Sequence, residues 1–148
     1  MIKIICVGKV KERFFNEAIK EYQKRIVKYT KLEIIEVPDF NYDVLKTINE
    51  EGKKILSKIN DKDFVVTLEI AGKPLSSMEF SGFIDKNISK NITFVIGGSY
   101  GLCEDVIKRS NYSLSFSNLT FPHQLFRVIL LEQIYRAFKI INKESYHK

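Results

Sequence analysis

Three segments of the sequence place glycine or small polar residues directly after an apolar run. Gly97 and Gly98 end one such run, and Gly101 follows three residues after Gly98. Leu68 lies near the end of a second run, and a third leads into the Ser/Thr-rich loop 117–122. Glycine lets a ligand approach the backbone closely and exposes its N–H and C=O groups. These segments therefore have the polarity and backbone freedom to cradle a small cofactor.

The spacing of the glycines narrows the class of cofactor. The pattern Gly97-Gly98-x-x-Gly101 lacks the first glycine of a complete GxGxxG motif, and the chain has no P-loop motif. A nicotinamide or nucleoside-triphosphate site is therefore poorly supported. Any one of these segments alone is more typical of a tight turn. Three of them at successive strand ends favour a ligand site, because open α/β sheets bind ligands beyond the carboxyl ends of their strands.

The C-terminal tail places an aromatic ring, an imidazole and a cation next to one another, as Tyr146, His147 and Lys148. An enzyme that modifies a nucleobase needs a stacking surface, a titratable group and a phosphate contact. The competing interpretation is a frayed chain end, which composition alone favours.

The segment before the tail has a helical pattern that carries both basic and apolar residues. Arg127, Arg136 and Lys139 form either a solvated basic face or a row of phosphate contacts. Apolar residues occupy nearly the whole circumference over residues 125–131, which predicts a subunit interface. His123, at the start of this helix, is more typical of a capping or packing residue than of a ligand or base.

Apolar runs and helical periodicity alternate along the chain. The predicted strands are Ile2–Val7, Leu32–Val37, Phe64–Ile70, Ile92–Ile96 and Tyr112–Phe116. The predicted helices cover residues 11–29, 43–59, 76–87, 103–109 and 123–141. Ala71 to Pro74 is predicted as a turn, and Ser76 with Glu79 as a capping box. Continuously apolar strands that alternate with helices predict an α/β fold, with one parallel sheet covered on both faces. No linker divides the chain, so residues 1–148 are expected to form one domain.

Composition limits the environment and the partners. The net charge of +6 is concentrated in residues 1–31 and 109–148, which fits a polyanionic partner at two faces or simply solvated lysines. Cys6 and Cys103 are far apart in the sequence and outside any CxxC spacing, so neither a disulfide framework nor a thiolate metal site is expected. This cysteine usage favours a reducing cytosol. No apolar run approaches the roughly 20 residues of a membrane span.

Taken together, several segments resemble the RlmH family of SPOUT-class methyltransferases, and the resemblance covers the whole chain. They are Gly72-Lys73-Pro74, IGGSYGL at 96–102, LTFPHQLFRVILLEQIYRAF at 119–138 and the terminal Tyr-His-Lys. The resemblance implies a parallel sheet with a C-terminal trefoil knot, a homodimer and S-adenosylmethionine as methyl donor. It also implies a cytoplasmic enzyme that methylates N3 of a pseudouridine in 23S ribosomal RNA, within the assembled ribosome or large subunit.

The resemblance also assigns roles to residues. The cofactor site would comprise Leu68, Gly97, Gly98, Ser117, Asn118, Leu119, Thr120, Phe121 and Pro122. The catalytic group would comprise Arg136, Tyr146 and His147, with the tail reaching the partner's cofactor. His147 would assist loss of the N3 proton, and Arg136 would stabilise the charge that develops on the base. Ser99-Tyr100 replaces the Pro-Glu of some relatives, which leaves the side-chain contribution there open.

Three other interpretations remain open from the sequence. One is a SPOUT methyltransferase acting on transfer RNA or on another ribosomal nucleoside. The second is a noncatalytic RNA-binding adaptor with a vestigial pocket. The third is a flavodoxin-like domain that binds flavin, which would make the purified protein yellow.

Overall fold

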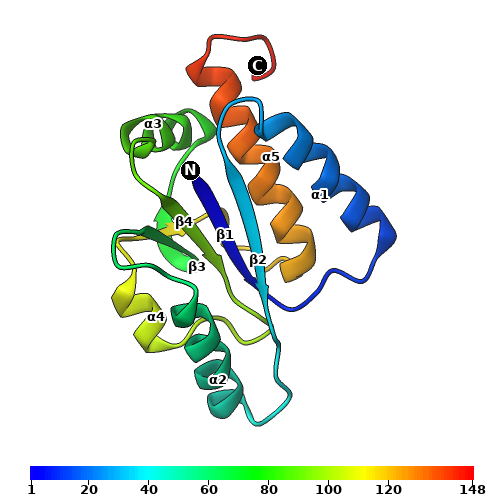
Figure 1. The fold of residues 1–148 in the computed structure, drawn as a ribbon, viewed down its shortest axis with the longest axis vertical. Coiled ribbons are helices and arrows are strands. Elements are labelled where there is room, and N and C mark those ends of the chain that lie inside the picture. Colours follow the sequence, from blue (N-terminus) through cyan, green and yellow to red (C-terminus); the bar gives the residue numbers. More distant parts are fainter.

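Apolar, β-branched runs form one five-stranded sheet in the computed structural model, which describes residues 1–148 (Figure 1). The strands are β1 (Ile2–Val7), β2 (Leu32–Val37), β3 (Phe64–Pro74), β4 (Ile92–Ile96) and β5 (Tyr112–Ser115). All pairings are parallel, and the order across the sheet is β2-β1-β4-β3-β5. The predicted α/β class and the five parallel strands are therefore confirmed, and all five carboxyl ends point the same way.

Helices cover both faces of the sheet. They are α1 (Arg13–Ile26), α2 (Val44–Ser57), α3 (Ser77–Asn87), α4 (Glu104–Arg109) and α5 (His123–Ile141). The larger apolar core joins alternate strand residues such as Ile4 and Phe94 to α1, α3 and α5. The smaller core joins the intervening residues, such as Ile5 and Val95, to α2 and α4. Alternation along each strand thus divides the apolar runs between the two layers.

The end of β3 differs from the prediction. Residues Ala71 to Pro74 were expected to form a turn, but β3 continues through them to Pro74. Leu114 of β5 pairs with both Leu68 and Lys73, so the strand bulges between these two residues and then resumes pairing. A Cβ on Gly72 would lie 2.7 Å from the Leu114 backbone, so only glycine permits the close approach. The predicted capping box of α3 is confirmed, since Ser76 and Glu79 exchange hydrogen bonds.

A buried ion pair lies on the α2 and α4 side of the sheet. The Nζ of Lys3 lies 2.7 Å from Oδ2 of Asp63, with both side chains almost fully buried. Lys3 also donates to the carbonyl of Lys58, and the N–H of Asn60 donates to Asp63. Burial acts to raise the pKa of Asp63, but the bonds from Lys3 and Asn60 outweigh it and lower that pKa. The carboxylate therefore stays charged inside the protein.

Replacing Lys3 with Met leaves this carboxylate buried without its cation. We expect the free energy of unfolding of Lys3→Met to fall by about 3–5 kcal/mol at neutral pH. The difference from wild type should shrink as the pH falls through the lowered pKa of Asp63, because protonation removes the charge in both proteins. Urea unfolding measures both effects. The control is Lys53→Met, which breaks an exposed pair with Glu50 and should cost less than about 1 kcal/mol. Equal losses of unfolding free energy in the two variants would contradict a buried ion pair between Lys3 and Asp63.

Candidate functional site

The bulge of β3 at residues 68–71 and the carboxyl ends of β4 and β5 surround a cavity of about 490 Å³ with mainly apolar walls. Its volume is typical of a small-molecule site, for which the usual range is about 300–1,000 Å³. The predicted cofactor residues that line it are Leu68, Gly97, Gly98, Ser117, Leu119, Thr120 and Phe121. Asn118 and Pro122 belong to the same loop without lining the cavity. The three segments singled out in the sequence therefore meet at one place.

Several residues of the wall were not predicted as site residues. They are Glu69, Ile70, Ala71, Ser99, Tyr100, Leu102, Ile107, Leu114, Phe116, His123 and Phe126, together with Ile96 and Gly101. Most of them are neighbours in sequence of a predicted segment, so their position near a strand end is the feature that could have identified them as site residues. Ile107 and Phe126 reach the wall from α4 and α5, which only the tertiary structure reveals.

The glycine turn after β4 has a geometry that side chains would obstruct. The N–H of Gly101 donates to the carbonyl of Gly98 at 3.2 Å, and Gly101 has a φ of 87°. A Cβ on Gly97 would lie 2.8 Å from the Gly101 carbonyl oxygen. Gly97 and Gly101 therefore hold a tight turn that lines the cavity with backbone.

A buried carboxyl group supports this turn from behind. Glu51 of α2 is 3% exposed, and its Oε2 accepts a hydrogen bond of 3.2 Å from the N–H of Phe40. Its Oε1 has no hydrogen-bond partner and would lie 2.9 Å from a Cβ on Gly98. Burial raises the pKa of Glu51, the Phe40 hydrogen bond opposes this, and the nearby Asp39 adds to it. Glu51 thus packs against the backbone that forms one wall of the cavity.

Alanine at position 98 would press its methyl group against Glu51 and Val7. We expect Gly98→Ala to displace the turn and weaken binding of a ligand in the cavity by about 5- to 150-fold, corresponding to about 1–3 kcal/mol of overpacking. Calorimetric titration with S-adenosylmethionine, the donor that the sequence resemblance implies, measures the change. The control is Gly82→Ala, because a Cβ there meets nothing within 4 Å inside α3. The control should leave affinity unchanged and raise the free energy of unfolding by about 0.5–1 kcal/mol. Equal affinities for both variants would show that the turn does not bind the cofactor.

Two polar residues near the start of α5 are His123, predicted to cap or pack, and Arg127, predicted to be solvated or to contact phosphate. His123 lines the cavity and makes no capping hydrogen bond, so its side chain belongs to the wall. Burial lowers its pKa, the charge of Arg127 adds to this, and Asp39 opposes it. Arg127 is 2% exposed; its Nη1 pairs with Glu36 at 2.6 Å and its Nη2 donates to the carbonyl of Gly8. The prediction of a solvated or phosphate-binding Arg127 is therefore wrong. This residue anchors α5 to the ends of β1 and β2.

The C-terminal tail folds back onto the far half of α5. The hydroxyl of Tyr146 donates to Oε2 of Glu132 at 3.0 Å, and its ring lies 4.9 Å from the ring of Tyr135. The Nη1 of Arg136 lies 3.0 Å from Nδ1 of His147. Arg136, Tyr146 and His147 thus lie together at this end of α5. Composition alone favoured a disordered chain end, but in the structure side-chain contacts hold the tail against α5.

The tail group and the cavity lie apart within one chain. In Figure 1, α5 begins at the end of the sheet where β1 and β2 finish and runs to the opposite end, where the C-terminus lies. His123 and Phe126 line the cavity, whereas the tail contacts α5 at Glu132 and Arg136. These contacts lie six to thirteen residues further along α5, which corresponds to about 9–20 Å along the helix axis. No residue of the tail lines the cavity of its own chain.

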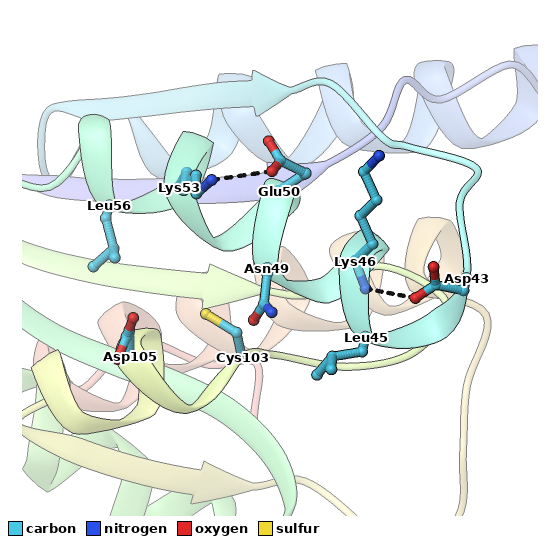
Figure 2. A pocket seen from close by; sticks show the side chains of 9 residues that line it. All are labelled: Asp43, Leu45, Lys46, Asn49, Glu50, Lys53, Leu56, Cys103 and Asp105. Atoms are coloured by element: carbon cyan, nitrogen blue, oxygen red, sulfur yellow. Dashed lines mark hydrogen bonds and ion pairs between the residues drawn. The ribbon is translucent and has the colours of Figure 1, made fainter.

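A second hollow, of about 510 Å³, lies between α2 and α4 and is shown in Figure 2. It is lined mainly by polar side chains, several of which already have partners. Lys53 pairs with Glu50 at 3.0 Å, and Asp43 accepts the N–H of Lys46 at the start of α2. It contains neither a strand end nor a glycine turn. We therefore take the cavity at the sheet edge as the candidate site.

The structure contains no cluster of three or more His, Cys, Asp or Glu side chains that could hold a metal ion. Cys6 and Cys103 are both buried as free thiols, and burial raises the pKa of Cys6 to about 12. No helix is both long and apolar enough to cross a membrane.

Comparison with known proteins places the chain among methyltransferases along its whole length. The family model described as "Predicted SPOUT methyltransferase" matches residues 1–147. A protein of Clostridium botulinum (strain Alaska E43 / Type E3) is 54% identical over 99% of both chains. One of Carboxydothermus hydrogenoformans is 50% identical over the same shares. Both are named "Ribosomal RNA large subunit methyltransferase H".

Proposed function

The chain belongs to the SPOUT methyltransferase family, and from this premise we propose that it methylates N3 of a pseudouridine in 23S ribosomal RNA, with S-adenosylmethionine as donor. The observation that carries the proposal is the cavity at the bulge of β3 and the ends of β4 and β5, in a chain that matches its relatives from end to end. Because the substrate would be the ribosome or its large subunit, we place the enzyme in the cytoplasm.

The cavity fits the expected donor in size and in chemistry. Backbone groups of Gly97, Gly98 and the loop 117–122 would bind the polar ends of the donor. Apolar side chains of the wall, such as Leu68 and Phe121, would enclose the remainder of the donor. When bound, S-adenosylmethionine supplies an electrophilic methyl group on a sulfonium sulfur. The donor is already activated, so the main task of the protein is to align the acceptor nitrogen with that methyl group and to exclude water.

The second task is to stabilise the base once N3 has lost its proton. Arg136, Tyr146 and His147 together offer a cation, a ring for stacking and an imidazole. We propose that Tyr146 stacks on or beside the base, and that Arg136 stabilises the negative charge on its carbonyl oxygens.

The contact between Arg136 and His147 bears on the role of the imidazole. A guanidinium group has only N–H donors, so Nδ1 of His147 must accept this hydrogen bond. The neutral ring then carries its hydrogen on Nε2 and presents a donor to its surroundings. We therefore propose that His147 donates a hydrogen bond to the base and that the N3 proton passes to solvent. This differs from the role as proton acceptor that the resemblance implied.

A homodimer would bring the tail to the cavity. α5 keeps several apolar residues only partly buried, among them Leu125, Val128 and Ile129. If two copies of α5 pack antiparallel about a twofold axis, the tail end of one faces the His123 end of the other. That arrangement brings together the two halves of the site, which lie about 9–20 Å apart along α5 within one chain. We propose that each site combines one subunit's cavity with the other's tail.

We further propose that residues 1–148 form a single domain, in which the chain after β5 threads through a loop as a deep trefoil knot. The bulge in β3, the glycine turn and the loop 117–122 all line one cavity, and this proximity supports such a crossing. A single cooperative unfolding transition is expected for one domain. An experimental backbone trace in which residues 116–122 cross no other loop would remove the knot.

The decisive assay uses methyl-labelled S-adenosylmethionine and ribosomes from a strain that lacks the endogenous enzyme. We expect label to enter 23S rRNA at a single pseudouridine, identified by mass mapping of nucleosides. Label in transfer RNA or in another nucleoside would favour a different SPOUT enzyme. Failure to bind the donor in calorimetry would favour the RNA-binding adaptor, and a yellow protein would favour a flavin domain.

A further inference from the structure

One carboxylate without an assigned role lies at the centre of the tail contacts. Glu132 of α5 accepts hydrogen bonds from Arg136 through Nε at 3.3 Å and through Nη2 at 3.1 Å. The same carboxylate accepts the hydroxyl of Tyr146 at 3.0 Å and the amide of Gln133 at 2.8 Å. Its side chain is 20% exposed and that of Arg136 is 25% exposed, so solvent only partly screens the pair. A single group therefore contacts two of the three proposed catalytic residues directly.

The third residue is connected to Glu132 through Arg136. Two edges of the guanidinium group are occupied: Nε and Nη2 contact Glu132, and Nη1 contacts Nδ1 of His147. The guanidinium carbon also lies 4.8 Å from the centre of the Tyr146 ring, within range of a cation–π contact. Arg136 cannot rotate without breaking contacts to all three neighbours. The orientation of His147 thus depends on a carboxylate that it does not touch.

The tail has little else to hold its tip. The last backbone hydrogen bond of the chain runs from the N–H of Glu144 to the carbonyl of Lys139. Glu144 fixes the base of the tail through Tyr29 and Lys139. Beyond it, Tyr146 contacts Glu132, the ring of Tyr135 and the cation of Arg136, and His147 contacts Arg136. Side chains of α5, rather than backbone structure, therefore set where Tyr146 and His147 lie.

We infer that Glu132 is a positioning residue for methyl transfer, holding Arg136, Tyr146 and His147 in one array that is presented to the nucleobase. The inference rests on the proposed function and adds to it a residue that does not touch substrate or cofactor. A Glu132→Gln variant keeps the size of the side chain but loses the charge that gathers Arg136 and Tyr146. Misplacement of about 1 Å in such an array costs about 100-fold in rate.

The test measures single-turnover methylation of ribosomes at saturating S-adenosylmethionine. We expect Glu132→Gln to slow methyl transfer by about 10- to 100-fold, while its dissociation constant for the cofactor stays within about twofold of wild type. The matched control is Glu17→Gln, which breaks an exposed i,i+4 pair with Arg13 on α1 and should react at the wild-type rate. A Glu132→Gln variant with the wild-type rate, or with a rate loss that only follows lost cofactor binding, overturns the inference.

A spectroscopic measurement separates positioning from general destabilisation. Burial and then the bond to Glu132 raise the pKa of Tyr146 to about 12. In NMR titrations of protein with ¹³C-labelled tyrosine rings, the Tyr146 resonance should titrate at lower pH in Glu132→Gln. If that variant does not fold, Tyr146→Phe removes only the hydroxyl contact and should still slow methylation severalfold; an unchanged rate contradicts the array. Wild-type protein that fails to methylate any ribosomal RNA would instead refute the proposed function.

Discussion

Removal of residues 145–148 should abolish methyl transfer and leave the folded protein and its cofactor binding intact. The deletion takes away Tyr146 and His147 and leaves Arg136 paired with Glu132 alone. Loss of a donor at the developing charge costs about 100- to 1,000-fold, so loss of the whole tail should cost at least about 1,000-fold. The fold loses the contacts of Tyr146 with Glu132, Tyr135 and Arg136 and that of His147 with Arg136, which we expect to cost about 1–3 kcal/mol.

Single-turnover assays and calorimetry on the same truncated protein distinguish the two effects. The donor should bind with an affinity within about twofold of wild type, because no residue of the tail lines the cavity of its own chain. If the partner's tail completes the cavity, any small change in donor affinity arises from the loss of that partner's tail. A truncated protein with full activity would show that the tail takes no part in the reaction.

Single substitutions at His147 refine this prediction. His147→Ala should slow the reaction by about 100-fold or more, since it removes the N–H donor. His147→Gln keeps an N–H donor but has no group that accepts a proton near neutral pH, so it should retain most of the rate. If the glutamine variant is as slow as the alanine variant, His147 accepts the N3 proton after all.

Two inactive variants should restore activity when they are combined in one dimer. The subunit lacking residues 145–148 keeps an intact cavity, and the Gly98→Ala subunit keeps an intact tail. At a donor concentration well below the dissociation constant of the Gly98→Ala cavity, each homodimer is nearly inactive. A heterodimer then contains one complete site, formed from the cavity of one subunit and the tail of the other.

Co-expression with two affinity tags yields the mixed population. With random pairing, half of the dimers are heterodimers with one working site of two, so about one quarter of wild-type activity should return. The control replaces the Gly98→Ala subunit with one that carries both changes, which supplies no intact tail and should restore nothing. Activity no greater than that of the separate variants would show that each chain builds its site alone.

The strands and their parallel arrangement were accessible from the sequence because buried parallel strands are continuous apolar runs. The extension of β3 was not, since Ala71-Gly72-Lys73-Pro74 has the composition of a turn. Its pairing depends on β5, and Gly72 serves there to admit the Leu114 backbone. Local propensity cannot report a contact with a strand about forty residues further along the chain.

The parts of the candidate site that are lined by backbone could be predicted from the sequence. The parts that depend on the contacts of single side chains could be predicted less well. The three segments at the strand ends meet as expected, because parallel strands end at the same edge of a sheet. A charged residue such as Arg127 is expected at the surface, and the sequence does not reveal that it pairs with Glu36, which lies 91 residues earlier in the chain. Glu132 is likewise expected to be solvated on its helix, and only the folded structure shows that Tyr146 of the tail contacts it.

A crystal structure of the protein with S-adenosylmethionine tests the central claim most directly. The account predicts a dimer in which the donor contacts Leu68, Gly98 and the loop 117–122 of one subunit. The tail of the other subunit should lie beside the methyl group, with its imidazole still held by the guanidinium group. A donor bound outside this cavity, or a monomer whose own tail closes the site, would contradict it.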